Sequence, residues 1–253
     1  FEGVDLIIKR GEKVAFVGKN GEGKSTFVKC IMGEIPFDGT LKIGHNVQIG
    51  YFAQNQAQLL DENLTIYETI DRVATGDMRL RINDLLGAFM FGGETSEKYV
   101  KVLSGGERSR LAMIKLLLEP VNLLILDEPT NHLDIDTIAW LTNFLKSSKK
   151  TVLFITHDRY FLDNISTRIF ELDRASLIEY QGNYQDYVRL KAEQDERDAA
   201  LLHKKQQLYK QELTWMRRQP QARATKQQAR INRFHDLKQD LSGQSNQTDL
   251  EMN

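Results

Sequence analysis

The sequence predicts an α/β domain followed by a helical hairpin, and three observations lead to this fold class. Residues 1–184 alternate short apolar runs with amphipathic stretches, as strands and helices do in an α/β domain. The runs at 123–126 and 152–155 are wholly apolar, which is typical of parallel strands covered on both faces. From Tyr187 to about Arg218 the chain has no glycine or proline, and polar helix formers dominate.

Short apolar runs locate the strands of residues 1–184, and longer amphipathic stretches locate the helices. The strands are expected at 14–17, 47–51, 123–126, 152–155, 168–172 and 177–180. The helices are expected at 23–32, 66–73, 80–89 and 105–118. The last two strands follow each other closely, so they form a closing pair. We therefore assign residues 1–184 to one domain, with a helical subdomain at about 57–118.

The long polar helix that begins near Tyr187 ends before Pro220, because proline lacks a backbone donor and clashes with the preceding turn of a helix. A second helix is expected at 225–241. Two helices joined by a short turn form a hairpin, so residues 185–253 are predicted to be a basic helical linker. The basic residues near the tip of this hairpin are Arg217, Arg218 and Arg223.

The charge of the chain is distributed unevenly. The net charge is −1. Between His203 and Lys238 there are ten lysine and arginine residues and only two acidic residues, so this segment carries +8 and the remainder −9. A basic segment on an acidic body indicates a polyanionic partner for that segment alone. A solvated charged helix is the plainer interpretation, but ten bases with Trp215 and Pro220 near the tip exceed what solubility requires. We therefore expect the hairpin to contact nucleic acid.

The composition narrows the class of protein further. The one cysteine among 253 residues, Cys30, excludes disulfides within the chain and clustered cysteine metal sites, and its apolar surroundings predict a small core residue. The apolar run at 123–126 is far shorter than the roughly 18 residues of a membrane helix. The residues after Phe1 lack the pattern of a signal peptide. We expect no membrane segment and a reducing, cytoplasmic location.

A glycine-rich loop lies between the strand expected at 14–17 and the helix expected at 23–32. Residues 18–25 read GKNGEGKS, which fits the pattern G-x-x-x-x-G-K-[ST]. The glycines let the backbone curl so that its N–H groups face phosphate oxygens, and the helix N-terminus adds partial positive charge. The position between a strand and a helix disfavours a chance glycine-rich turn. The expected phosphate-binding residues of the loop are Gly18, Asn20, Gly21 and Gly23.

Three residues at the start of the following helix complete this site. Lys24 is expected to reach the β- and γ-phosphates, Ser25 to hold Mg²⁺, and Thr26 to bond the α-phosphate. The sequence therefore predicts that the chain binds ATP together with Mg²⁺.

An acidic pair follows the apolar run at 123–126, in the sequence LLILDE. A charge at the end of a buried strand is costly without a partner, and Mg²⁺ supplies that partner for Asp127. Glu128 then lies where it can orient and polarise an attacking water. The alternative is two solvated carboxylates at a strand end, which the presence of the phosphate loop disfavours. The pair is therefore predicted to serve the metal and the chemistry.

A histidine and a glutamine follow two other predicted strands. His157 follows the strand at 152–155, and beside a phosphate loop a γ-phosphate contact is the better interpretation, although a lone histidine is more often structural. Gln54 follows the strand that ends at Tyr51 and is expected to contact Mg²⁺ or water, whereas in isolation it would be a surface residue. The histidines without such a placement are interpreted as structural: His45, His132, His203 and His235.

Residues 103–107 read LSGGE, and together with the loop and the acidic pair they resemble the ATP-binding cassette superfamily of P-loop NTPases. The resemblance implies that Ser104, Gly105 and Gly106 bind the γ-phosphate of an ATP held by a different cassette. Two glycines and a serine at a helix start also make an anion site on physical grounds. Asp134, in LDEPTNHLD, is similar to the loop that signals across the dimer. A second cassette, in tandem or as a dimer, is therefore an expected partner.

Within the superfamily the chain resembles the ABC-F branch. The motifs that carry this resemblance are TNHLD, THDRYFLD, and GNYQDY ahead of LTWMRRQPQARATKQQAR. ABC-F proteins are soluble, carry two cassettes in one chain and act on the ribosome, and their linker reaches toward tRNA and the peptidyl-transferase region. The resemblance therefore implies an ATPase that contacts the ribosome or tRNA through Arg217, Arg218 and Arg223.

Three features depart from the family pattern. Family cassettes begin with additional strands and an aromatic residue that stacks on adenine, and Phe1 lies after that point, so we expect an N-terminally truncated cassette with an altered adenine contact. We expect no second cassette after Asn253. The stretch GYFAQNQ resembles a second cassette, whereas the histidine region and linker resemble the end of a first cassette and the linker after it. A fragment and a join of two halves are both open.

Other classes of protein share part of this pattern. The ATPase subunit of a membrane transporter has every catalytic motif but needs no basic hairpin. A DNA-associated repair ATPase uses such a hairpin on DNA. A non-catalytic binding module is disfavoured, because Lys24, Asp127, Glu128 and His157 are all present. The leading hypothesis is an ABC-F ATPase that acts in translation.

Overall fold

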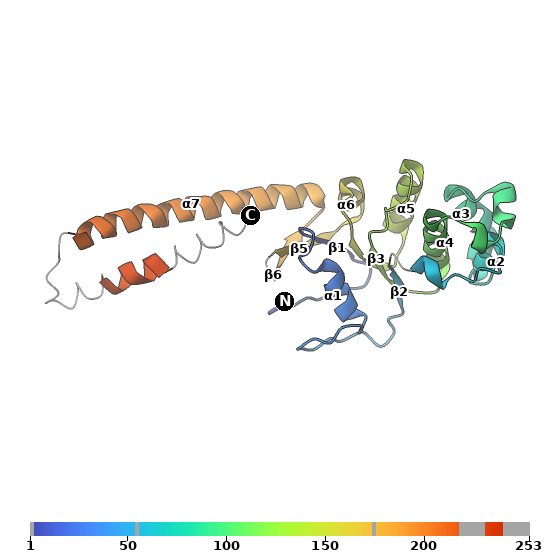
Figure 1. The fold of residues 1–253 in the computed structure, drawn as a ribbon, viewed down its shortest axis with the longest axis horizontal. Helices are drawn as coiled ribbons and strands as arrows, with labels where there is room; N and C mark the ends of the chain where they lie inside the picture. The colour runs from blue at the N-terminus through green and yellow to red at the C-terminus, as the bar shows by residue number, and fades with distance from the viewer. Residues whose placement is uncertain (1–2, 54–55, 174–175, 218–230, 240–253) are drawn as a thin grey trace. The chain divides into compact units, whose positions relative to one another are not determined.

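The computed structural model describes residues 3–53, 56–173, 176–217 and 231–239 (Figure 1). The chain divides into two compact units, residues 1–188 and 189–253. The first contains a sheet with its helices, and the second contains most of a long helix, α7 (Tyr184–Arg217). No helix within the described residues is long and apolar enough to cross a membrane.

The described residues of the first unit form a six-stranded sheet in the order β2-β3-β4-β1-β5-β6. The strands are β1 (Lys13–Val17), β2 (Ile49–Phe52), β3 (Leu123–Asp127), β4 (Thr151–Ile155), β5 (Arg168–Asp173) and β6 (Ser176–Gln181). Neighbouring strands are parallel except for β5 and β6, which are antiparallel. The carboxyl ends of β1, β3 and β4 therefore meet at one edge of the sheet, where ligands bind in open α/β sheets.

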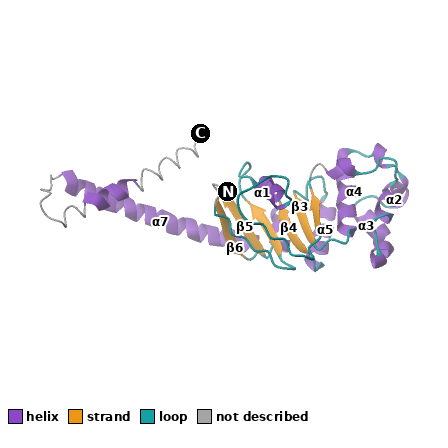
Figure 2. Ribbon diagram, turned by 90° about the horizontal axis from the view of Figure 1, so that it is seen from below, coloured by secondary structure: helices purple, strands orange, loops and turns teal. Residues whose placement is uncertain are grey.

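Helices cover both faces of this sheet (Figure 2). On one face, Phe16 of β1 packs on Phe27 of α1 (Lys24–Ile31) with ring centroids 5.0 Å apart. On the other face, Phe154 of β4 packs on Phe161 of α6 (Arg159–Ile165) with ring centroids 5.4 Å apart. Every residue of β1 and β4 is buried, which explains why both strands are apolar without alternation after their first residues, Lys13 and Thr151.

The chain between β2 and β3 is mainly helical. It contains the 3₁₀ turns η1 (Gln56–Leu59), η2 (Gly76–Arg81), η3 (Gly93–Glu97) and η4 (Val100–Val102), and the helices α2 (Ile66–Asp71), α3 (Ile82–Ala88) and α4 (Gly105–Leu118). Capping boxes start α2 at Thr65 and α4 at Ser104, so local sequence determines where both helices begin. Phe89, which follows α3, packs edge to face on Trp140 of α5 (Ile135–Ser147), and this contact ties the helical segment to the sheet domain.

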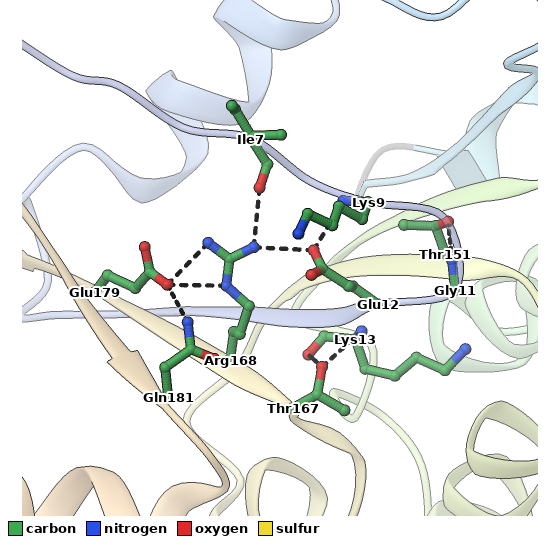
Figure 3. Close-up of polar contacts among 10 residues, drawn as sticks. All are labelled: Ile7, Lys9, Gly11, Glu12, Lys13, Thr151, Thr167, Arg168, Glu179 and Gln181. Atoms are coloured by element: carbon green, nitrogen blue, oxygen red, sulfur yellow. Dashed lines mark hydrogen bonds and ion pairs between the residues drawn. The ribbon is translucent and has the colours of Figure 1, made fainter.

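A buried arginine joins the N-terminal segment to the last two strands, as Figure 3 shows. The Arg168 guanidinium donates to the Ile7 carbonyl and to the Glu12 carboxylate, both at 2.9 Å. It also lies 3.0 Å from the Glu179 carboxylate of β6, and Gln181 donates to the same carboxylate. The side chain of Arg168 is only 13% exposed, so these contacts compensate for the burial of its charge.

The second unit contains two helical segments that pack through aromatic rings. Residues 231–239 are helical, and Phe234 in this segment stacks on Tyr209 of α7 with ring centroids 5.3 Å apart. Phe234 is 6% exposed, so its ring is buried by this contact. The arrangement is that of a hairpin of two helices. Pro220 and the rest of the second helix expected at 225–241 lie outside the described residues, as do Arg218, Arg223 and the side chain of Arg217.

The predicted α/β fold is confirmed, and most of its elements lie within two residues of their expected bounds. The stretch expected as one helix at 80–89 is instead the turn η2 followed by α3. The sequence did not predict α5 and α6, because β-branched and aromatic residues of low helix propensity occupy much of both. Cys30 is half-buried rather than within the core. The domain bounds at 184 and 185, and the subdomain at about 57–118, stay predictions.

Candidate nucleotide-binding site

The glycine-rich loop begins where β1 ends and leads directly into α1. Gly18 has φ of 148°, and a Cβ at this position would collide with the carbonyl oxygen of Leu172 at the end of β5. Gly23, the N-cap of α1, has left-handed backbone with φ of 89° and ψ of 20°. A side chain at Gly18 is excluded by the neighbouring strand, and one at Gly23 is disfavoured by the backbone conformation. The loop therefore needs glycine for its path.

Lys24, the first residue of α1, lies in the curve of the loop. Its Nζ donates hydrogen bonds to the carbonyls of Gly18 at 2.7 Å and Lys19 at 2.9 Å, and the residue is 8% exposed. Burial lowers the pKa of the ammonium, and the negative charges of Glu128 and Asp127 oppose that shift. The ammonium group of Lys24 is thus held in place by two loop carbonyls and interacts electrostatically with the acidic pair.

The acidic pair lies where β3 ends. Burial raises the pKa of Asp127, and a hydrogen bond from the Ser25 side chain and the charge of Lys24 oppose the shift. Burial also raises the pKa of Glu128, against the opposing effect of His157. The backbone N–H of Glu128 donates to the Ile155 carbonyl at 2.9 Å, and Glu128 has a positive φ of 51°. The backbone of the pair is therefore fixed by contact with the neighbouring strand end.

His157 joins the acidic pair from the end of β4. Its Nε2 lies 3.5 Å from Oε1 of Glu128, and its backbone N–H also interacts with the Glu128 carboxylate. The imidazole is 58% exposed, whereas the Glu128 side chain is 19% exposed. The histidine can therefore reach a ligand in the cavity while it contacts the carboxylate.

A cavity of about 560 Å³ collects most of the residues predicted from the sequence to bind nucleotide. Those that line it are Asn20, Gly21, Gly23, Lys24, Ser25, Thr26, Asp127, Glu128 and His157. Gly18 takes part through its bond to Lys24. Gln54, which is expected to serve the metal or the water, lies outside the described residues.

Further residues line this cavity that were not predicted from the sequence as site residues, and of these Lys29, Glu34 and Tyr51 carry polar groups. Burial raises the pKa of Tyr51 to about 12, and the negative charges of Asp127 and Glu34 add to the shift. Tyr51 is therefore a neutral hydroxyl that can donate a hydrogen bond into the cavity. Its position in β2, next to β3 in the sheet, is the signal that could have identified it.

Gly105 and Gly106 line a second cavity of about 540 Å³ rather than the first. Glu128 and His132 also line it, and His132 has a positive φ of 66°. Ser104 is the N-cap of α4, where its hydroxyl donates to the Glu107 carboxylate at 2.7 Å. The glycines of LSGGE and the phosphate loop of the same chain thus line different cavities, both of which Glu128 also lines.

Asp134 caps a helix. Its carboxylate accepts hydrogen bonds from the backbone N–H groups of Asp136 and Thr137 and from the Thr137 hydroxyl at 2.7 Å. These bonds lower the pKa of Asp134. The residue that resembles a signalling loop therefore fixes the start of α5.

The donors around the first cavity suit a nucleoside triphosphate with a divalent cation. The start of α1 and Lys24 present positive potential to an anion. Ser25 and Asp127, which contact each other, offer hard oxygen ligands. Within the described residues there is no cluster of three or more His, Cys, Asp or Glu side chains that could hold a metal alone. At the usual Mg²⁺ site one or two carboxylates and substrate phosphates supply the ligands, and Asp127 is such a carboxylate.

Comparisons with known proteins agree with this geometry. A family model described as ABC transporter matches residues 1–131, just over half of the chain, and a second model of the same description matches residues 170–252. ABC transporter F family member 2 of Arabidopsis thaliana is 43% identical over 211 residues, which cover 81% of this chain and 31% of the relative. The energy-dependent translational throttle protein EttA of Haemophilus influenzae is 32% identical over 276 residues, covering 92% of this chain and 49% of the relative.

Among solved structures, the archaeal ribosome recycling factor aABCE1, in complex with the ribosomal stalk protein aP1, is similar with a TM-score of 0.60 and 26% identity. The match covers 74% of this chain and 37% of that one. The chain spans less than half the length of each of these three proteins. It belongs to the ABC transporter family of ATP-binding cassette ATPases, and its homologues include members of the ABC-F branch.

Proposed function

We propose that the chain binds ATP with Mg²⁺ in the first cavity, at the N-terminus of α1, and hydrolyses it. The observation that carries this proposal is the meeting of the phosphate loop, Asp127, Glu128 and His157 around one cavity. In this proposal Lys24 and the loop hold the phosphates, and Ser25 and Asp127 would hold Mg²⁺, which would supply positive charge next to the phosphates. Gln54 remains a proposed further contact to the metal or the water.

Glu128 is the group proposed to activate water. Its carboxylate is partly buried beside His157 and has a raised pKa, so it is a better proton acceptor than an exposed glutamate. His157, which contacts the same carboxylate, orients it and is proposed to contact the γ-phosphate. The proton of the attacking water passes to Glu128 while the water oxygen bonds to phosphorus and the bond to the leaving ADP oxygen breaks.

A second cassette is proposed to complete the site. Ser104, Gly105 and Gly106 lie at the start of α4, where backbone N–H groups can bind an anion, and the two glycines line a cavity distinct from that of the phosphate loop. In the proposal they bind the γ-phosphate of an ATP held by another cassette. One chain then contributes two half-sites.

This arrangement predicts how hydrolysis depends on concentration. Because two cassettes must meet, the ATPase rate per chain should rise with protein concentration and level off once the dimer is populated. A phosphate-release assay over a wide dilution series measures this. Ser104→Ala should lower the plateau, and adding Lys24→Ala protein, which keeps LSGGE, should restore part of it. A rate per chain that stays constant down to dilute monomer would contradict the shared site.

We further propose that the protein acts on the ribosome in translation. The segment between His203 and Lys238 carries +8 on a body that carries −9, so its natural partner is a polyanion. The relatives include an ABC-F protein and a protein named as a translational throttle, and the similar archaeal factor is named for ribosome recycling. In the proposal the hairpin contacts ribosomal RNA or tRNA through Arg217, Arg218 and Arg223.

Reversing the charge of the hairpin tip tests this contact. Changing Arg217, Arg218 and Arg223 to Glu should weaken ribosome binding strongly and flatten its salt dependence, because each lost phosphate contact lowers the salt slope by about 0.7–0.9. Co-sedimentation at several salt concentrations measures both effects. The matched control changes the exposed cassette residues Arg72, Lys146 and Lys149 to Glu, with the same change in net charge. Equal losses in both variants would show that net charge, rather than the hairpin, governs binding.

A further inference from the structure

A buried carboxylate that the nucleotide site does not use lies in β5. Glu171 is 6% exposed, and it accepts a hydrogen bond from the Tyr187 hydroxyl at 2.9 Å and another from Tyr180 at 3.4 Å. Burying a carboxylate is costly unless hydrogen bonds replace its water. The two tyrosines therefore do more than fill space, because their hydroxyls donate hydrogen bonds to a carboxyl group that the fold has buried.

Glu171 lies next to the phosphate loop. In the sheet it is the register partner of Val17, the residue before Gly18. The next residue along β5, Leu172, presents its carbonyl so close to Gly18 that a Cβ there would collide with it. The carbonyl of Gly18 in turn accepts the bond from Lys24 Nζ at 2.7 Å. The end of β5 is therefore in direct contact with the loop and, through the Gly18 carbonyl, with Lys24.

The other partner, Tyr187, belongs to the first turn of α7. This turn is part of the first unit and is fixed to the sheet domain by hydrogen bonds and ring contacts. Asn183 and Asp186 exchange backbone-to-side-chain hydrogen bonds at 3.1 and 3.3 Å. Gln185 donates to the Asp163 carboxylate of α6 through its backbone and its side chain, at 3.2 and 3.0 Å. The ring of Tyr187 packs edge to face on Tyr180, with centroids 5.0 Å apart. The Tyr187 hydroxyl is thus held in place before it meets Glu171.

We propose that the Tyr187–Glu171 hydrogen bond is a positioning contact that couples nucleotide in the phosphate loop to the first turn of α7. The inference rests on the proposed ATP site at Lys24. When the loop closes on phosphates, the adjoining end of β5 is held in one position, and Glu171 fixes the Tyr187 turn with it. Coupling of this kind is reciprocal, so a fixed first turn of α7 also favours the loop conformation that binds nucleotide.

Hydrogen exchange with a non-hydrolysable ATP analogue and Mg²⁺ tests the coupling. In the unmodified chain we expect the analogue to slow amide exchange both at 18–26 and at 183–188. Tyr187→Phe, which removes only the hydroxyl, should lose the response at 183–188 and weaken analogue binding by roughly fivefold. The matched control is Tyr184→Phe, which removes a hydroxyl from the same turn and should keep both. Glu171→Gln retains an acceptor for Tyr187 and should also keep the response.

The outcomes separate the coupling from a purely structural role. If 18–26 responds in the unmodified chain but 183–188 does not, the coupling is wrong while the ATP site stands. If neither segment responds, the ATP site fails and the coupling with it. If Tyr187→Phe lowers thermal stability but leaves affinity and the 183–188 response intact, the hydroxyl only stabilises the fold and the proposal is overturned. Should Tyr187→Phe not fold, Glu171→Leu, which removes the acceptor of the Tyr187 hydroxyl, takes its place, and a 183–188 response that survives in that variant would overturn the proposal.

Discussion

Replacing Glu128 with Gln should lower the rate of ATP hydrolysis by roughly a hundredfold or more and leave ATP binding nearly unchanged. The amide keeps the shape of the side chain and most of its hydrogen bonding but cannot accept the proton of the attacking water. Binding should persist because the phosphates are held by the loop and Lys24, and a carboxylate in the same cavity repels them. A phosphate-release assay and a nucleotide titration on the same protein measure the two effects.

The geometry around Glu128 makes this substitution selective. The residue is fixed through its backbone N–H to Ile155, which the substitution leaves in place. Glu94→Gln, at an exposed glutamate of η3, is the matched control and should hydrolyse ATP normally. Near-normal hydrolysis by Glu128→Gln would remove it from the catalytic role. Loss of hydrolysis together with ATP binding would show that the residue supports the structure of the site.

Lys24→Ala should have the largest effect on binding itself. We expect ATP affinity to fall roughly thirtyfold or more, because truncating one partner of a buried charge pair costs about 2–5 kcal/mol. Two causes add in this case. The positive charge that meets the phosphates is lost, and the bonds from Nζ to the Gly18 and Lys19 carbonyls, which hold the loop closed, are lost with it.

Isothermal titration with MgATP measures the affinity of the Lys24 variant, and circular dichroism establishes that it is folded. Lys146→Ala, at an exposed lysine of α5 outside the cavity, provides the matched control and should bind as the unmodified chain does. An unchanged affinity in a folded Lys24→Ala protein would place the phosphates elsewhere in the molecule.

The central part of the fold was predictable because its sequence signals are local. An apolar run such as 152–155 indicates a buried strand, and the structure has β4 there. The glycine pattern that ends at Gly23 indicates a loop before a helix, and Gly23 is the N-cap of α1 with left-handed backbone. The helices α5 and α6 were not predicted, since many of their residues have low helix propensity and their buried faces are stabilised by tertiary packing. Their N-caps, Asp134 and Asp158, are local signals that could have marked where they begin. Packing between distant segments leaves no periodic signal in a short stretch of sequence.

The candidate site shows the same division. Its charged groups follow strand ends that meet in a parallel sheet, so their convergence could be inferred from the order of strands and loops. Tyr51 enters the cavity from β2 and Glu34 from the segment after α1. Tyr51 lies in the stretch GYFAQNQ, but neither residue was predicted from the sequence alone to take part in the site. The Tyr187–Glu171 bond joins residues from α7 and β5 whose meeting depends on the three-dimensional path of the chain.

A crystal structure of the Glu128→Gln protein with ATP and Mg²⁺ would test the proposed site most directly. We predict a triphosphate in the loop at Lys24, a cation on Ser25 and Asp127, and Ser104–Gly106 of a second copy at the γ-phosphate. A nucleotide bound away from Lys24, or held in the loop with its cation on other residues, would contradict the proposed site.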